Sequence, residues 1–296
     1  MSTEFTESGR PVVVGVDGSP SSLAAARFAA ADAARRGAPL HLVYGYELPI
    51  YGYAPIGVIS FPAAEEERFR ADVETMLAGT AKQLHADFPE LGRIEYELLS
   101  GGGATVLLEQ SRTAALTVVG CRGVGGFAEL LLGSVSAQVA AHAHGPVAVV
   151  RPPVGDVAPG PEQPVGAAAP LSPVVVGYDD STPGKAALAF AVDEAKRRSA
   201  RLILVNVCTP GAEKDAATML AHAVADHAQG GIAVETRVVT ADNVEKAMVE
   251  ASADAGLIVV GSRGRGGFAG LLLGSVSRAL VHHARRPVAV VHPTEY

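Results

Sequence analysis

Two kinds of hydrophobic pattern alternate along this chain. Short runs of β-branched and other apolar residues predict buried strands, and longer stretches with apolar residues at helical spacing predict amphipathic helices. In the first half the predicted strands are residues 11–17, 40–45, 93–99, 116–120 and 146–150. The predicted helices between them are residues 20–36, 64–87, 104–113 and 134–143.

The second half repeats this order. Its predicted strands are residues 173–178, 202–208, 232–239, 257–261 and 287–291, and its predicted helices are residues 183–198, 213–228, 242–254 and 274–284. Alternating strands and helices indicate an α/β fold, a doubly wound parallel sheet with helices on both faces. We expect two such five-stranded domains, each with strand order 3-2-1-4-5. In that order ligands bind at the carboxyl ends of the strands, where the winding reverses between strands 1 and 4.

The two halves are also similar residue by residue. Residues 120–150 align with residues 261–291 without a gap, and 21 of the 31 positions are identical. The first predicted strand and the aspartate that ends it, Asp17, likewise match the strand that ends at Asp179. We therefore predict a first domain at residues 1–152, a linker at 153–170 rich in Pro, Gly and Ala, and a second domain at 171–296.

The repeat is interrupted once. The offset between matching residues falls from 162 at Asp17 to 141 at Gly120, so the first half carries about 21 extra residues. Residues 48–62, rich in Tyr, Pro and Gly, are the evident place for them. We expect a long loop there, for which a floppy insertion and a lid are both open readings.

Composition excludes several classes of protein. The net charge of −7 argues against nucleic-acid binding, which needs a basic surface to neutralise phosphates. The two distant cysteines, Cys121 and Cys208, make no disulfide framework and favour a reducing compartment. The N-terminus lacks the apolar core of a signal peptide, and no apolar run is long enough to span a bilayer. We expect a cytoplasmic protein.

A glycine-rich loop follows predicted strand 4 in both halves. It has the spacing Gly-x-x-Gly, nine residues, Gly-Ser, and a Gly-Gly pair lies within it. Glycines allow positive φ and let main-chain N–H groups converge on an anion, and the helix that follows adds unpaired N–H donors. Nearby arginines would add positive charge: Arg122 in the first half, Arg263 and Arg265 in the second. The spacing matches neither a Walker loop nor the classical dinucleotide fingerprint.

At these residues the chain resembles the universal stress protein family in its tandem, ATP-binding form. The resemblance implies ATP, with Mg²⁺, as the ligand of each half. The first site would comprise Gly15, Asp17, Gly45, Val119, Gly120, Arg122, Gly123, Gly125, Gly126, Gly133, Ser134, Val135 and Ser136. The second would comprise Gly177, Asp179, Val207, Val260, Gly261, Arg263, Gly264, Arg265, Gly266, Gly267, Gly274, Ser275, Val276 and Ser277.

The resemblance also implies a pairing of domains and one weak point. The last strands of the halves, residues 147–150 and 288–291, would be edges that join in a homodimer or in a pseudo-dimer within one chain. Gly45 offers no side chain to adenine where the second half has Val207. The first site would then bind more weakly unless the insertion compensates.

Other candidate residues have simpler interpretations. Asp17 and Asp179 lack a second carboxylate at a defined spacing, so a positioning role is favoured over general-base catalysis. The histidines near the end of the fourth helix of each half suit a helix C-terminus better than a zinc site. Cys121 lies in the first loop, but Ser262 replaces it in the second, so the loop does not require a thiol.

Three functions remain open from the sequence. The favoured one is an ATP-binding stress-response regulator with two sites, in which occupancy controls conformation or partner binding. A slow ATPase or phosphotransferase is the second, although no catalytic set is evident. An assembly module that joins partners independently of nucleotide is the third.

Overall fold

The computed structural model describes residues 9–47, 51–54, 57–59, 63–123, 132–152, 172–227, 231–265 and 273–293. In the first half the order is β1 (Val12–Gly15), α1 (Pro20–Arg36), β2 (Leu40–Tyr46), β3 (Tyr51–Ala54), β4 (Gly57–Ile59), α2 (Ala63–Asp87), β5 (Ile94–Ser100), α3 (Gly103–Gln110), β6 (Leu116–Gly120), α4 (Ser134–His142) and β7 (Val147–Val150). In the second half it is β8 (Val174–Gly177), α5 (Thr182–Arg198), β9 (Leu202–Cys208), α6 (Glu213–His227), β10 (Val234–Thr240), α7 (Val244–Ala251), β11 (Leu257–Gly261), α8 (Ser275–His283) and β12 (Val288–Val291).

The elements begin and end where local chemistry dictates. The Ser19 side chain caps α1 by accepting a hydrogen bond from the Ser22 N–H at 3.1 Å, and Pro20 occupies the first turn. Gly37 ends α1 in the left-handed conformation at φ 61°. Every predicted strand and helix is present, with bounds that differ by a few residues.

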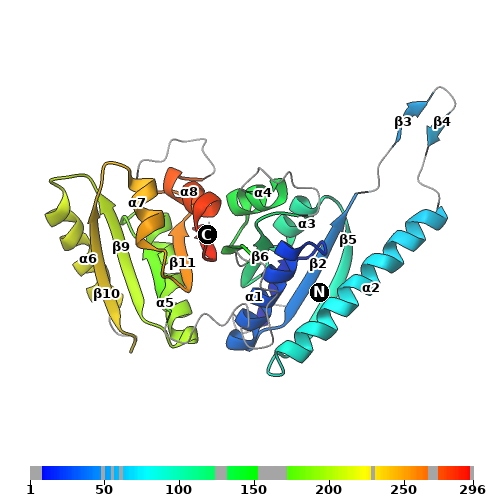
Figure 1. The fold of residues 1–296 in the computed structure, drawn as a ribbon, viewed down its shortest axis with the longest axis horizontal. Coiled ribbons are helices and arrows are strands. Elements are labelled where there is room, and N and C mark those ends of the chain that lie inside the picture. The colour runs from blue at the N-terminus through cyan, green and yellow to red at the C-terminus, as the bar shows by residue number, and fades with distance from the viewer. Residues whose placement is uncertain are drawn as a thin grey trace.

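All the described strands except β3 and β4 form one sheet, which corrects the expectation of two separate five-stranded sheets. The order is β10-β9-β8-β11-β12-β7-β6-β1-β2-β5, ten strands in all (Figure 1). Each half keeps the order 3-2-1-4-5, and β7 pairs antiparallel with β12 through Val149↔Val288, Ala148↔Ala289 and Val147↔Val290. The two apolar edges expected to pair do so within one chain, because each satisfies the other's unpaired main-chain groups.

Both faces of this sheet are covered by helices from both halves. Helices α1, α2, α5 and α6 pack over one face and α3, α4, α7 and α8 over the other. Each face holds a single apolar cluster that continues from the first half into the second. The β7–β12 seam therefore lies inside the core.

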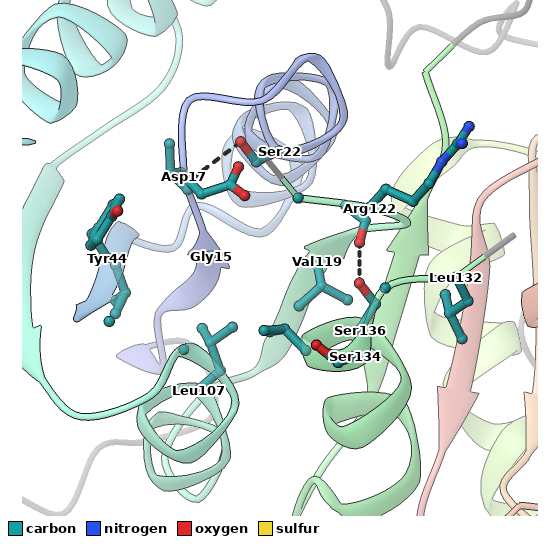
Figure 2. Close-up of a pocket in the computed structure, with 18 residues that line it drawn as sticks. Gly15, Asp17, Ser22, Tyr44, Leu107, Val119, Arg122, Leu132, Ser134 and Ser136 are labelled. Atoms are coloured by element: carbon teal, nitrogen blue, oxygen red, sulfur yellow. Dashed lines mark hydrogen bonds between the residues drawn. The ribbon is translucent and has the colours of Figure 1, made fainter. Parts of the chain in front are cut away.

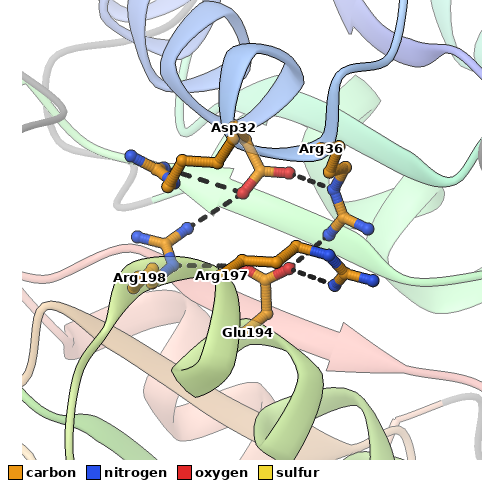
Figure 3. A network of polar contacts seen from close by, with 6 residues as sticks. Asp32, Arg36, Glu194, Arg197 and Arg198 are labelled. Atoms are coloured by element: carbon orange, nitrogen blue, oxygen red, sulfur yellow. Dashed lines mark hydrogen bonds and ion pairs between the residues drawn. The ribbon is translucent and has the colours of Figure 1, made fainter.

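Helices α1 and α5 also meet through a buried ionic cluster, which sequence patterning did not reveal (Figure 3). Arg198 Nη2 donates to Asp32 Oδ1 at 3.1 Å across the seam, and Arg36 donates to Glu194 in the opposite direction. The carboxylates of Asp32 and Glu194 are fully buried. Burial alone would raise the pKa of Asp32, but Arg36 and Arg198 lower it to about 2. Burial and the negative charge of Asp32 raise the pKa of Glu194.

Two further side chains cross the seam on the opposite face. Arg151, just after β7, donates to the carbonyls of Val281 and His282 at the C-terminal end of α8, at 2.8 and 2.6 Å. His292, just after β12, lies 3.0 Å through Nε2 from the Ala140 carbonyl in α4. A residue of each half thus contacts the C-terminal part of a helix in the other half.

The insertion and the linker differ in what can be said of them. Within residues 48–62, predicted as a loop, β3 and β4 pair antiparallel as a hairpin that projects from the end of the molecule (Figure 1). The predicted linker, residues 153–170, lies outside the described residues. Among the described helices, none combines the length and the apolar character needed to cross a bilayer.

Candidate functional site

A cavity opens at the carboxyl ends of β1 and β6 in the first half and of β8 and β11 in the second. The first encloses about 470 Å³ and the second about 480 Å³. All the predicted site residues that the structure describes line these two cavities. Gly125, Gly126, Gly266 and Gly267 lie outside the described residues. The reversal of winding therefore creates a cavity in each half, as the predicted strand order requires.

A helix N-terminus forms one end of each cavity, that of α4 in the first and that of α8 in the second. Gly133 is the N-cap of α4 and Gly274 that of α8, and neither has a side chain to cap the helix. Ser134 and Ser275 are the first helical residues, so their hydroxyls are not caps. Unpaired N–H groups at a helix start, together with the helix dipole, attract an anion.

We call the glycine-rich loop of each half, with its Gly-x-x-Gly, nine-residue, Gly-Ser spacing, the cradle. Close packing requires its first two glycines, Gly120 and Gly123 or Gly261 and Gly264, which corrects the expectation of positive φ. None of the described ones has it: Gly120, Gly123, Gly133, Gly261, Gly264 and Gly274. A Cβ on Gly120 would lie 2.6 Å from the Ser21 carbonyl carbon, and one on Gly261 would lie 2.6 Å from the Pro183 carbonyl carbon. These glycines let the first turn of α1 or α5 cross directly over the end of the neighbouring strand.

The strand 1 aspartates hold the cradle together. Asp17 Oδ1 accepts from the Ser19 N–H at 3.0 Å, and a Cβ on Gly123 would collide with its other oxygen. Asp179 Oδ1 accepts from Ser181 Oγ at 2.6 Å and its Oδ2 accepts from the Arg265 N–H at 2.9 Å. Both oxygens of Asp179 are thus engaged by the protein, which favours positioning over catalysis.

The serines that follow the cradle bind the sheet. Ser136 Oγ donates to the Gly120 carbonyl (Figure 2). Ser277 Oγ likewise donates to the Gly261 carbonyl at 2.7 Å. Both side chains are buried. Their hydroxyl protons point away from any ligand, so only main-chain N–H groups at these positions could reach a phosphate.

The arginine before the second cradle glycine lines the cavity of its half, Arg122 in the first and Arg263 in the second. Figure 2 shows the Arg122 side chain leading away from the cavity that Asp17 and Tyr44 border. Its charge helps to lower the pKa of Arg151, after burial, and the charge of Arg263 likewise helps to lower that of His292. Arg265 also lines the second cavity.

Sequence reasoning missed several residues that line the cavities, most of them apolar. They are Val16, Ser22, Val43, Tyr44, Gly103, Leu107 and Leu132 in the first half, and Tyr178, Gly184, Val205, Val244, Met248 and Leu273 in the second. Leu107 and Met248 occupy the space over Gly15 and Gly177, where a Cβ would lie 2.7 and 3.2 Å from them. The apolar period of their short helices was the available signal.

Tyr44 is the notable addition to the first cavity. It lies on β2 at the side nearest Asp17 (Figure 2). Burial, and then the negative charge of Asp17, raise the pKa of its hydroxyl. The matching residue in the second half, Asn206, donates instead to the Tyr178 carbonyl at 2.8 Å. An aromatic wall is therefore present in the half whose Gly45 lacks a side chain.

Two carboxylates, Glu245 and Asp180, lie beside the second cavity and have no counterpart in the first half. A hydrogen bond from Ser275 lowers the pKa of Glu245, where the first half has Ala104. Bonds from Lys185 and Tyr178 lower the pKa of Asp180, where the first half has Gly18. The cradles match in sequence, but their surroundings do not.

Comparison with known proteins agrees with this architecture. The model of the universal stress protein family matches the chain twice, at residues 9–151 and 171–292. The universal stress protein Rv2623 of Mycobacterium tuberculosis H37Rv is 34% identical over 302 residues, covering 94% of this chain and 95% of its own length. Rv1996 of the same strain is 35% identical over 320 residues, covering 98% and 96%.

A solved structure supports the fold. The crystal structure of a universal stress protein from Archaeoglobus fulgidus DSM 4304 superposes with a TM-score of 0.71 at 21% identity. The superposition covers 96% of each chain. The tandem arrangement of the two halves is therefore shared over the full length.

Proposed function

This chain belongs to the universal stress protein family, and from that premise we propose that it binds ATP in both cavities, with occupancy setting the conformation offered to partners. The observation that carries the proposal is the pairing, in each half, of an apolar cavity with an uncapped helix N-terminus. An adenine ring needs the first of these features and a polyphosphate the second.

The dimensions of the cavities support a ligand of this size. Volumes of about 470 and 480 Å³ fall in the usual range of small-molecule sites. Valines flank the apolar end of each, Val43 and Val119 in the first and Val207 and Val260 in the second. A base would stack between such aliphatic walls, and its phosphates would run toward Ser134 or Ser275.

Binding without rapid turnover fits the carboxylates. A general base needs an oxygen free to accept a proton from an attacking water. The oxygens of Asp179 already accept hydrogen bonds from Ser181 and Arg265. We therefore favour a switch that reports nucleotide occupancy over an ATPase.

Mg²⁺ would accompany the triphosphate. Mg²⁺ bound with a nucleotide is usually held by phosphate oxygens and water, with one or two carboxylates. Asp17, beside the first cradle, is the carboxylate placed to contribute there.

Two aspartates at the helix starts would test the proposal. Ser134→Asp with Ser275→Asp adds negative charge where the phosphates would lie, and acidic residues in a first helical turn are compatible with the helix. Calorimetry should find two ATP bound per wild-type chain and at least about a hundredfold weaker binding in the double variant. Unchanged binding would overturn the proposal.

The matched control is Ser134→Asn with Ser275→Asn, which changes size similarly without charge. We expect this control to bind ATP within about threefold of wild type, because a surface polar exchange has small effects. Thermal melting should show all three proteins folded, which matters at Ser275 because Glu245 is near. Alanine at Gly120 or Gly261 is a poorer test, since its Cβ would lie 2.6 Å from helix main chain.

The switch itself has a separate readout. Hydrogen exchange with and without ATP should show added protection in α4 and α8, because a bound phosphate satisfies their first N–H groups. Protection confined to the cradles, with no change in α1, α5 or the β7–β12 seam, would limit the protein to binding alone. Phosphate release measured in parallel would reveal hydrolysis.

A further inference from the structure

Four polar residues form a connected group beside the second cavity. The Asp180 carboxylate accepts from the Tyr178 hydroxyl at 3.0 Å and lies 3.2 Å from Lys185 Nζ. Its other oxygen lies 3.5 Å from Arg265 Nη2. One carboxylate thus contacts two cations beside the second cavity.

The first half has none of these four side chains. At the matching positions its sequence reads Val16, Gly18, Leu23 and Val124. The exchange is complete, since every polar member is replaced by an apolar residue or by glycine. A group that serves only the shared cradle would be expected in both halves, whereas this group belongs to the second half alone.

The backbone of Asp180 indicates that its side chain matters. It adopts φ 61°, the left-handed region where glycine is favoured and where the first half has Gly18 at φ 81°. Ser199, at the end of α5, is the other described non-glycine residue with positive φ. Strain of this kind persists where the side chain makes interactions that offset it.

Arg265 is the member that reaches the cavity. Its main-chain N–H is fixed to Asp179 Oδ2 at 2.9 Å, directly after the second cradle glycine, and the residue lines the second cavity. Its side chain is 62% exposed, and its link to Asp180 is long at 3.5 Å. An exposed pair of this length costs little to break, so the guanidinium is available to a stronger anion.

Lys185 is placed differently although it shares the same carboxylate. It lines a neighbouring hollow between α5 and α6, and the Arg265 guanidinium also borders that hollow, 3.3 Å from the Met219 sulfur. The two cations therefore share one carboxylate and one hollow, but only Arg265 also lines the second cavity. This provides a matched pair for an experiment.

We propose that Arg265 makes the second cavity select a nucleoside triphosphate over a diphosphate, with Asp180 as the residue that positions it. This inference rests on the proposed nucleotide binding. A terminal phosphate adds negative charge and acceptor oxygens, and arginine binds such groups through two parallel N–H bonds. On binding, the guanidinium leaves Asp180 for the phosphate. The first cavity, with Val124 at the matching position, lacks this selection.

The test isolates the second cavity. All variants are built on full-length Ser134→Asp, which disables the first site, and calorimetry measures the dissociation constants of ATP and ADP. Arg265→Val, the residue of the first half, should weaken ATP binding at least about tenfold, because a charge-assisted bidentate contact is lost. ADP binding should weaken less than about threefold, since it lacks the phosphate concerned.

Lys185→Leu is the control, again the residue of the first half. It should leave the ratio of ATP to ADP affinity within about twofold of the parent, because an exposed charge outside the cavity is screened. If Lys185→Leu changes this ratio as much as Arg265→Val does, general electrostatics explains the selection and the proposal is overturned.

Asp180→Asn tests the positioning role. Asparagine tolerates φ 61° and can still hydrogen-bond to Tyr178, but it releases Arg265. ATP should bind about threefold tighter when Arg265 is present and unchanged when it is valine, since the two residues then act through one contact. An equal effect in both backgrounds would overturn the role of Asp180.

Failure of this inference and failure of nucleotide binding give different results. Equal losses for ATP and ADP in Arg265→Val would refute selection by Arg265 while leaving two nucleotide sites intact. Absence of any nucleotide binding to the wild-type chain would refute the proposed function itself.

Discussion

The two halves share the glycine cradle but differ in the residues that surround it. At the apolar end, Gly45 and Gly103 of the first cavity stand where the second has Val207 and Val244. Beside the cradle, the first half carries Gly18, Leu23 and Val124 where the second carries Asp180, Lys185 and Arg265. Identity in the cradle motif therefore does not make the sites equivalent.

The apolar end differs because a helix lies closer in the first half. A Cβ on Gly45 would lie 2.8 Å from the Gly103 Cα and 3.0 Å from the Gly101 carbonyl oxygen. The main chain at the start of α3 thus occupies the volume that a valine side chain would fill. The absence of a side chain at Gly45 reflects this close approach, and Tyr44 supplies an aromatic wall nearby.

The largest loss of stability should come from breaking the buried ionic cluster between α1 and α5. Glu194→Gln leaves Arg36 and Arg198 with one buried carboxylate, and we expect a loss of about 3 kcal/mol in the free energy of unfolding. Asp87→Asn breaks the exposed ion pair that Asp87 of α2 makes with Arg27 of α1. This change should lower the free energy of unfolding by less than about 1 kcal/mol. Urea denaturation measures both, and similar losses would mean that the cluster contributes no more than a surface pair.

Matched alanine variants at the apolar ends should behave unequally. Gly45→Ala forces a Cβ into α3 main chain, so we expect about 2 kcal/mol of destabilisation and weaker nucleotide binding at the first site. Val207→Ala removes methyl groups that are half-buried, at about 1 kcal/mol, without a clash. A Gly45→Ala protein as stable as wild type would show that α3 moves freely and that the close approach is not a constraint.

Exchanging the residues after the strand 1 aspartates should give unequal changes. Gly18→Asp places a side chain at φ 81° and should destabilise by about 1 kcal/mol. Asp180→Gly relieves the strain at φ 61° but also loses the exposed contacts that offset it, so its stability should stay close to that of wild type. Thermal unfolding compares the pair; a destabilised Asp180→Gly would assign real stability to the Lys185 and Arg265 contacts.

The smallest effect concerns pH at the seam. Burial, and then Arg263, His142 and His144, lower the pKa of His292 below its usual 6.5. The unfolded chain therefore binds more protons than the folded one below pH 6.5, and stability falls as the pH decreases through that range. His292→Gln should lose less stability than wild type between pH 7.5 and 5.5. Parallel losses in urea titrations would contradict this.

Part of the fold followed directly from local pattern. Each strand 1 segment is a run of three valines followed, after two further residues, by Asp17 or Asp179. Ser19 with Pro20 marks the start of α1, and Gly37 marks its end. These signals are local, because capping and backbone geometry depend on neighbours in the sequence. The hairpin within residues 48–62 lacked strict alternation and was read as a loop.

The reasons behind the site were less accessible to the sequence. The glycine spacing located both cavities, but it suggested positive φ, whereas Gly120 and Gly261 are needed because α1 and α5 cross over them. Leu107 and Met248 line the cavities from helices whose pattern marks only a buried face. Such contacts join residues that are far apart in the sequence, about a hundred positions for Gly120 and Ser21. No local pattern records them.

By itself the sequence determined a repeated α/β unit, the reversal of winding at strands 1 and 4, and the position of a glycine cradle at that reversal. These features follow from periodicity and repetition, which a chain carries in its own order of residues. Only the tertiary structure decided that ten strands share one sheet, that Asp32 and Glu194 exchange arginine partners across its seam, and that each cavity has its own charge and floor. Those properties arise from distances between side chains on different elements, which depend on how the layers pack.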